Sequence, residues 1–356
     1  MGNLIMATPA RLILETGEIF HGQSPTELHE MHYGEVVFNT GMVGYVESLT
    51  DPSYAGQIIV FTYPLIGNYG VAPESDWESK KIHVKGVIMS ELAPFYSSHS
   101  AHRSLSEWLQ QQNIPHLIDV DTRAVTKRLR EQGVIPGVIA PAANKPDHFE
   151  PFEKIDWVKE VSIKEPRTYG TGEKVIIVVD CGIKENIIRS LLEYPVKLKR
   201  VPYDYDFTNE AFDGVFISNG PGDPVHCQKT ISILKKAMNL KKPTFGICLG
   251  TQLMALAVGA KTYKLPFGHR SHNQPCLQIG TDHCYLTSQN HSYAVDENTL
   301  PSDWKVAFRN LNDQSVEGIE HKELPFFAVQ FHPEAAPGPM DTMWLFNKFY
   351  DLVSQK

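Results

Sequence analysis

Apolar and polar positions change their periodicity near residue 174. From there on, short apolar runs alternate with amphipathic stretches, and residues 175–180 are apolar at nearly every position, as in parallel strands buried on both faces. This pattern predicts a doubly wound α/β domain with its site at the carboxyl ends of the strands. The predicted strands are 175–180, 196–201, 214–218 and 243–247, and the predicted helices are 185–192, 230–239 and 249–258.

The first 140 residues mix short strands with helices. Apolar stretches on either side of Thr16-Gly17 predict a β-hairpin, and Asp121 and Gly133 suit the two ends of a helix. Proline, lysine and glutamate then become frequent. We therefore predict a mixed α/β domain over 1–140, a linker over 141–172 and the doubly wound domain over 173–356. Further predicted elements are strands 35–39 and 57–62 and helices 104–112 and 122–132.

The composition is that of an ordinary globular protein. The chain has 356 residues, of which 42% are hydrophobic and 21% charged. Its net charge of −8 argues against broad nucleic-acid binding. No apolar run approaches the roughly 18 residues of a membrane span, and the run at 1–6 is too short for a signal peptide, so a cytoplasmic location is expected. The five cysteines show no paired spacing, which predicts reduced thiols and no zinc site.

One cysteine lies where a predicted strand meets a predicted helix. Gly246 and Gly250 stand two residues to either side of Cys248, as in the Gly-x-Ser-x-Gly elbow of hydrolases with sulfur replacing oxygen. An elbow of this kind exposes the nucleophile, and the free N–H groups at the start of the helix favour the thiolate. The spacing predicts a catalytic nucleophile, and a buried structural thiol is the alternative.

A complementary half-site follows an apolar run near the C-terminus. His332 lies where Pro333 would end a strand. Residues two apart in an extended chain share a face, so Glu334 can hold one imidazole nitrogen and leave the other for the sulfur. Nucleophile, base and orienting carboxylate together make a catalytic triad.

A loop rich in glycine and proline, residues 218–224, follows the strand before the nucleophile strand. The carboxyl ends of parallel strands meet at one edge of a sheet, so this loop is expected beside Cys248. We expect the N–H groups of Gly220 and Leu249 to form an oxyanion hole. A turn without a ligand is the alternative.

These residues resemble a known family. The sequences Phe-Gly-Ile-Cys-Leu-Gly-Thr-Gln at 245–252 and Phe-His-Pro-Glu at 331–334 resemble the class I, or triad, glutamine amidotransferases. Residues 40–54 and 63–70 would otherwise be two Gly/Pro-rich loops. They are very similar to the N-terminal signature of carbamoyl-phosphate synthase small subunits, which other triad amidotransferases lack. The resemblance to that small-subunit family covers nearly the whole chain.

The resemblance implies residues that bind L-glutamine. It places Gly222 in the substrate site and Ser53 at its edge, reaching over from the N-terminal domain, although Ser53 alone would read as a turn serine. Gln252 stands one helical turn beyond Cys248 and resembles the family glutamine that contacts substrate.

Residues 287–295 resemble the family's substrate-holding loop. This likeness implies contacts to glutamine from Asn290, Ser292 and Tyr293. Most members carry glycine where Ser292 stands, so serine would be strained if this backbone needs a positive φ.

Two other features carry weaker implications. His269 and His272 suggest a metal, but no third ligand has suitable spacing, so no metal site is predicted. Helix 122–132 carries four basic residues that fit either a solvated face or a subunit contact: Arg123, Lys127, Arg128 and Arg130. No phosphate-binding signature occurs in the sequence, so the chain is not expected to bind ATP.

The resemblance implies hydrolysis of L-glutamine to glutamate and ammonia through a thioester on Cys248, with no cofactor in this chain. A large synthetase subunit, using ATP, Mg and bicarbonate, would take the ammonia and make carbamoyl phosphate for arginine and pyrimidine synthesis, in a heterodimer or an oligomer of heterodimers. One alternative is an amidotransferase for anthranilate or GMP synthesis, against which the first 140 residues count. Another is a non-catalytic scaffold, which would not need Cys248, His332 and Glu334 together.

Overall fold

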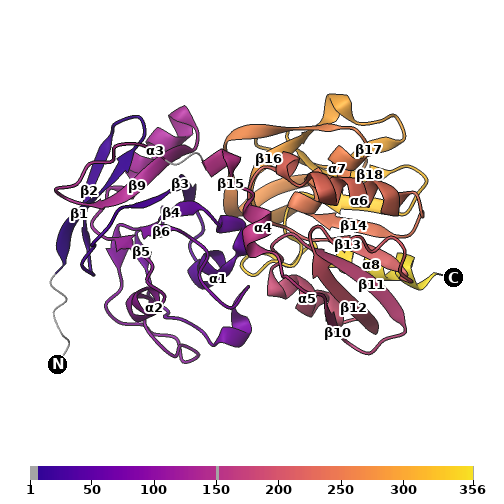
Figure 1. The fold of residues 1–356 in the computed structure, drawn as a ribbon, viewed down its shortest axis with the longest axis horizontal. Helices are drawn as coiled ribbons and strands as arrows, with labels where there is room; N and C mark the ends of the chain where they lie inside the picture. Colours follow the sequence, from indigo (N-terminus) through magenta and orange to yellow (C-terminus); the bar gives the residue numbers. More distant parts are fainter. Residues whose placement is uncertain (1–6, 150–151, 356) are drawn as a thin grey trace. The chain divides into compact units, whose positions relative to one another are not determined.

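The computed structural model describes residues 7–149 and 152–355. The chain forms two compact units, Met1–Ile155 and Asp156–Lys356 (Figure 1). Their division falls within the predicted linker, and the part of that stretch in the second unit contains α4 (Trp157–Val161) and β10 (Arg167–Tyr169). The apolar run at 1–6, considered above as a signal peptide, lies outside the described residues.

The first unit is built on a seven-stranded sheet in the order β2-β1-β9-β3-β4-β6-β8. The predicted hairpin is confirmed, because β1 and β2 pair in antiparallel fashion on either side of Gly17. Strands β3, β4, β6 and β8 are parallel to one another. The strands are β1 (Thr8–Leu14), β2 (Ile19–Ser24), β3 (His32–Asn39), β4 (Gln57–Phe61), β6 (Gly86–Ile88), β8 (His116–Leu117) and β9 (Ile135–Pro141), with a separate pair of β5 (Leu65–Ile66) and β7 (Glu91–Leu92).

Helices and short turns cover this sheet. The Asp121 carboxylate caps α3 and Gly133 ends it, as predicted, and the Ser104 hydroxyl caps α2. The core of the unit includes Tyr45 of α1 and Trp108 of α2, both fully buried. The helical segments are α1 (Tyr45–Thr50), α2 (Leu105–Gln111), α3 (Thr122–Gln132) and the 3-10 turns η1 (Pro52–Tyr54), η2 (Glu74–Asp76) and η3 (Phe152–Lys154).

The second unit contains a ten-stranded sheet in the order β10-β12-β11-β13-β14-β19-β18-β17-β15-β16. Strands β12, β11, β13, β14 and β19 are parallel. Their side chains alternate between two cores, one shared with α6 and α7 and the other with α5 and α8. Helices therefore cover both faces, which confirms the doubly wound α/β prediction. The elements are β11 (Lys174–Asp180), α5 (Glu185–Leu192), β12 (Val196–Pro202), β13 (Gly214–Ile217), α6 (Gln228–Met238), β14 (Thr244–Ile247), α7 (Leu249–Ala257), β19 (Phe326–Val329) and α8 (Trp344–Ser354), with a 3-10 turn η4 (Pro224–His226).

The other half of this sheet is antiparallel. The stretch 287–295, expected as a loop, is instead part of a long strand that pairs with β15. Its buried side chains are largely polar, so the hydrophobic alternation by which a strand is recognised is missing. The strands are β15 (Lys261–Gln278), β16 (Cys284–Asp296), β17 (Trp304–Asn310) and β18 (Val316–His321), with a 3-10 turn η5 (Glu297–Thr299).

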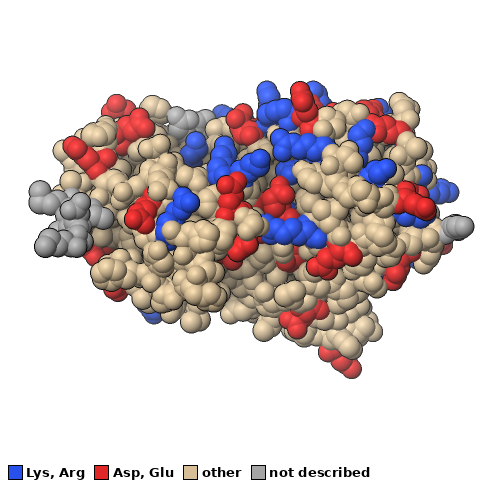
Figure 2. All heavy atoms as spheres, turned by 90° about the horizontal axis from the view of Figure 1, so that it is seen from below, with Lys and Arg blue, Asp and Glu red and all other residues tan. Residues whose placement is uncertain are grey.

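The surface has mixed charge. Basic and acidic side chains are interspersed over the face seen in Figure 2, in keeping with the modest net charge of −8. Among the described residues, no helix combines the length and the apolar character that crossing a membrane requires.

Candidate active site

Cys248 occupies a strained turn between β14 and α7. Its backbone has φ 54° and ψ −106°, a conformation that costs a non-glycine residue about 1–3 kcal/mol. The two flanking glycines permit this turn. A Cβ on Gly246 would lie 2.8 Å from the Gly250 carbonyl, and a Cβ on Gly250 would lie 2.4 Å from the Ile217 carbonyl oxygen. The predicted elbow is therefore present, and no larger residue fits at either glycine without movement of the backbone.

His332 reaches the elbow from the neighbouring strand. Strands β14 and β19 pair with Ile247 opposite Val329, and the Cys248 N–H donates to the Val329 carbonyl at 2.9 Å. His332 follows the end of β19, and its backbone N–H donates to the Ser288 carbonyl. The carboxyl ends of two adjacent parallel strands thus bring together residues far apart in sequence.

Glu334 orients the imidazole as predicted. His332 Nδ1 and Glu334 Oε1 are 2.6 Å apart, and both side chains are buried. Burial alone lowers the pKa of His332, but the Glu334 carboxylate and nearby Cys248 outweigh it and raise this pKa to about 10. The thiol of Cys248 donates to the Asn290 carbonyl at 3.5 Å, and His332 Nε2 has no hydrogen-bond partner among the residues described. This nitrogen is free to exchange a proton with a substrate.

Lys184 is a site residue that the sequence did not reveal. Its buried ammonium donates to Glu334 Oε1 at 3.0 Å and to the Ala335 carbonyl at 2.6 Å. Burial raises the pKa of Glu334, but Lys184 and then His332 outweigh this effect and lower it to about 2. The carboxylate therefore stays ionised. A lysine just before a helix normally faces solvent. The one sequence feature that pointed to the site was the position of Lys184 in the loop after the carboxyl end of β11.

The glycine-rich loop lies against the elbow. A Cβ on Gly220 would come within 2.8 Å of Leu249 Cδ2 and 2.1 Å of the Cys181 carbonyl oxygen. The two proposed oxyanion donors therefore belong to neighbouring segments, as predicted. Gly222 adopts a φ of 84° next to Trp157, in the same turn.

Three residues of the proposed glutamine site come together with Cys248. Gln252 Nε2 donates to the Tyr293 carbonyl at 2.9 Å, so α7 is tied to β16, and the Asn290 carbonyl accepts from the thiol. Ser292 lacks the positive φ that would have strained a serine, and its hydroxyl accepts a 2.5 Å hydrogen bond from Arg270. Their contacts with glutamine stay predictions.

Ser53 belongs to the first unit. It lies buried in η1, where its N–H donates to the Asp51 carboxylate at 2.8 Å. Its expected role at the edge of the glutamine site stays a prediction.

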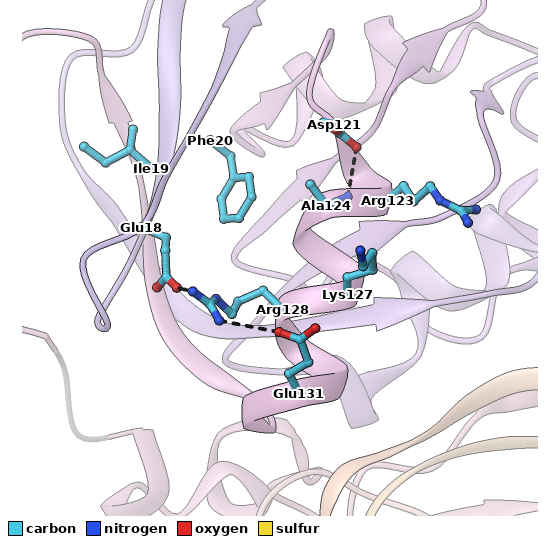
Figure 3. A pocket seen from close by; sticks show the side chains of 9 residues that line it. All are labelled: Glu18, Ile19, Phe20, Asp121, Arg123, Ala124, Lys127, Arg128 and Glu131. Carbon is cyan, nitrogen blue, oxygen red and sulfur yellow. Dashed lines mark hydrogen bonds and ion pairs between the residues drawn. The ribbon is translucent and has the colours of Figure 1, made fainter.

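The basic helix α3 lines a hollow of about 690 Å³ on the first unit (Figure 3). Figure 3 shows Arg128 between Glu18 and Glu131, with ion pairs to both. Part of the basic stripe is thus neutralised within the unit. Arg123 and Lys127 line the same hollow, and their contact with a subunit stays a prediction.

Fold and site together define a class I glutamine amidotransferase. Residues 177–352 match the family described as "Glutamine amidotransferase class-I". Residues 12–139 match "Carbamoyl-phosphate synthase small chain, CPSase domain", which accounts for the first unit.

Relatives resemble the chain over both units. It is 48% identical over 361 residues to the carbamoyl phosphate synthase arginine-specific small chain of Aspergillus oryzae, covering 97% of this chain and 80% of that one. Identity to the same-named protein of Yarrowia lipolytica is 48%, with coverage of 98% and 83%. Multifunctional protein CAD of Squalus acanthias is 49% identical over 96% of this chain, which spans 16% of that protein's length. The chain belongs to the carbamoyl-phosphate synthase small-chain family.

Proposed function

We propose that this chain hydrolyses L-glutamine to glutamate and ammonia through a thioester on Cys248. The observation that supports this most directly is the placement of Cys248 on a strained elbow, with the His332–Glu334 pair at the end of the adjacent parallel strand. A thiol, a base and an orienting carboxylate in this arrangement suit acyl transfer.

The first half of the reaction forms the thioester. The Cys248 thiolate attacks the side-chain amide carbon of glutamine, and negative charge develops on the amide oxygen. The N–H groups of Gly220 and Leu249 stabilise that charge. The imidazolium of His332 donates its proton to the leaving nitrogen, the C–N bond breaks and ammonia departs.

The second half regenerates the enzyme. His332, now neutral, takes a proton from water, and the resulting hydroxide attacks the thioester carbonyl. The C–S bond breaks, glutamate leaves, and the proton stays on His332 beside the thiolate. Glu334, kept ionised by Lys184, stabilises the imidazolium that begins the first half and forms again in the second.

The ammonia is proposed to pass to a large synthetase subunit. Free ammonia is protonated at neutral pH and loses its nucleophilicity, so hydrolysis is useful only if the product reaches a second active site directly. That subunit would consume ATP, Mg and bicarbonate to make carbamoyl phosphate, while this chain needs no cofactor. The names of the relatives, an arginine-specific small chain and a multifunctional protein, support such a partner. The assembly is proposed to be a heterodimer or a larger oligomer of heterodimers in the cytoplasm.

The test mixes this chain with the large subunit from the same organism and measures carbamoyl phosphate formed from glutamine, bicarbonate and ATP. Cys248→Ser is expected to lower glutamine-dependent synthesis by at least about 10⁴-fold and to leave synthesis from added ammonia unchanged. Loss of both activities in a folded complex would contradict this division of labour. No glutamine-dependent product from a pair that still uses ammonia would mean that the chain serves another synthase.

A further inference from the structure

Three buried side chains converge in the antiparallel part of the sheet, and one of them belongs to the strand that carries the proposed glutamine contacts. His269 of β15, His291 of β16 and Glu317 of β18 come from different strands, and one ligand atom from each lies within 4.8 Å of the others. His269 Nδ1 is 3.2 Å from His291 Nε2 and 3.4 Å from Glu317 Oε1, and the remaining separation, His291 Nε2 to Glu317 Oε1, is 3.8 Å. Nothing in the proposed reaction uses this cluster.

The outer hydrogen bonds of the two imidazoles fix their tautomers. His269 Nε2 lies 2.8 Å from the Asp313 carboxylate and His291 Nδ1 lies 2.9 Å from the Tyr293 carbonyl. Both partners only accept, so each of these nitrogens carries the proton and a neutral ring leaves its inner nitrogen bare. Two nitrogen lone pairs then face each other and the Glu317 carboxylate. The centre of the cluster therefore requires a cation.

Glu317 supports the same conclusion. Its carboxylate is fully buried, yet within the described residues Oε1 has, besides His269 Nδ1 at 3.4 Å, only two long hydrogen bonds, from Asn310 at 3.4 Å and Ser315 at 3.5 Å. Oε2 has no hydrogen-bond partner within the described part of the chain. The Gln289 side-chain oxygen adds a fourth acceptor, 3.2 Å from His291 Nε2. A buried carboxylate so poorly supplied with donors is costly unless a positive charge lies beside it.

A proton and a metal ion are the two candidate cations. Burial lowers the pKa of His269, but hydrogen bonds to Asp313 and Glu317 outweigh it and raise it to about 9, so an imidazolium is one solution. A proton on His269 Nδ1 would serve His291 and Glu317 only through long bonds, and it leaves those two acceptors facing each other. In contrast, tetrahedral ligands at about 2.0–2.1 Å from zinc lie about 3.4 Å apart, close to the three separations observed.

We propose that His269, His291 and Glu317 bind one divalent transition-metal ion, zinc by preference, with Gln289 or water as fourth ligand. Two imidazoles and a carboxylate are a common zinc donor set, and each imidazole already donates its other N–H to an oxygen acceptor, as zinc-bound histidines do. The ion is structural. It joins β15, β16 and β18, and so fixes the strand segment next to Asn290, whose carbonyl contacts Cys248.

The test measures the metal content of the full chain. The protein is prepared with added zinc, freed of loosely bound metal with a weak chelator, and analysed by inductively coupled plasma mass spectrometry. We expect about one zinc per chain, and X-ray absorption showing only nitrogen and oxygen ligands at about 2.0–2.1 Å. His269→Gln and Glu317→Gln are each expected to lower the bound zinc at least tenfold.

Two variants serve as matched controls. His272→Gln removes a histidine that lies in β15 but outside the cluster. Cys248→Ser removes the thiol of the triad, where zinc could also bind through sulfur. Both variants should keep about one zinc per chain. Wild-type protein that retains less than about a tenth of an equivalent of zinc, cobalt or nickel would overturn the proposal in favour of a buried proton. Sulfur ligation, or zinc lost with Cys248→Ser, would overturn it in favour of the triad cysteine. The zinc content of the wild-type chain tests the proposal even if a variant fails to fold.

Discussion

The two halves of the ten-stranded sheet are built from different kinds of side chain. The parallel half, made of β12, β11, β13, β14 and β19, buries almost only apolar residues, and its two faces lie under helices. The antiparallel half buries polar groups, including Thr287, Ser288, Gln289 and His291 on β16. The parallel half ends in the groups that would break bonds, and the antiparallel half holds the strand that would position the substrate.

Specific contacts couple the two halves. The Cys248 thiol donates to Asn290, Gln252 donates to Tyr293 and the His332 N–H donates to Ser288, so three residues of the parallel half each touch the main chain of β16. The substrate strand is therefore held in register with the nucleophile. Variants of the triad residues at the end of the parallel half should change kcat, and variants in β16 should change KM.

The largest expected effect comes from the base. His332→Asn removes the imidazole that is hydrogen-bonded to Glu334, and we expect kcat for glutamine hydrolysis to fall about 10²–10⁴-fold with little change in the binding of glutamine. Steady-state glutaminase assays with the complete complex measure both constants. A rise in KM at unchanged kcat would break the division between the two halves.

Lys184→Met tests the buried ion pair behind the triad. Removal of one partner leaves the Glu334 carboxylate with less compensation, which typically costs about 3–5 kcal/mol of unfolding free energy. Chemical denaturation of the isolated chain measures this loss. Lys348→Met, which removes a lysine paired with Glu320 closer to the surface, is the control and should cost less than about 1 kcal/mol. Equal losses in the two variants would contradict a special role for Lys184.

The pH dependence of stability tests the same pair. The pKa of Glu334 is lowered from 4.5 to about 2, so its contribution is present above pH 4.5 and lost as the pH falls towards 2. The pKa of His332 is raised from 6.5 to about 10, so its contribution is present below pH 6.5 and lost as the pH rises through 10.

The stability difference between wild type and His332→Asn should therefore shrink between pH 6.5 and 10. We expect a decrease of at least about 1.4 kcal/mol, the equivalent of one pKa unit, in urea denaturation at the two pH values. A difference independent of pH in this range would show that the imidazole is not charged in the folded protein.

The sequence predicts the parallel half better than the antiparallel half for a physical reason. Apolar runs and flanking glycines reveal the elbow at Cys248 and the strand before His332, because burial on both faces leaves a continuous signal. Strand β16 buries polar residues that satisfy one another, so it reads as a loop. Lys184 and Glu317 were missed because their partners come from distant segments, which no local spacing records.

Substitution of Ser292 has the smallest expected effect among the tests that compare the two halves of the sheet. The serine lies in extended β16 without a positive φ, and its hydroxyl accepts from Arg270, which also donates to the Phe267 carbonyl. Ser292→Ala removes one hydrogen bond, so we expect a loss of about 1 kcal/mol and a KM raised no more than about fivefold at unchanged kcat.

Ser292→Gly separates backbone from side chain at the same position. Glycine loses more conformational freedom on folding, so this variant should be about 0.5–1 kcal/mol less stable than Ser292→Ala. Thermal denaturation and glutamine KM of the two variants give the comparison. If Ser292→Gly proved more stable than Ser292→Ala, residue 292 would require a positive φ, which the structure does not show. This part of β16 would then be a loop and not an extended strand.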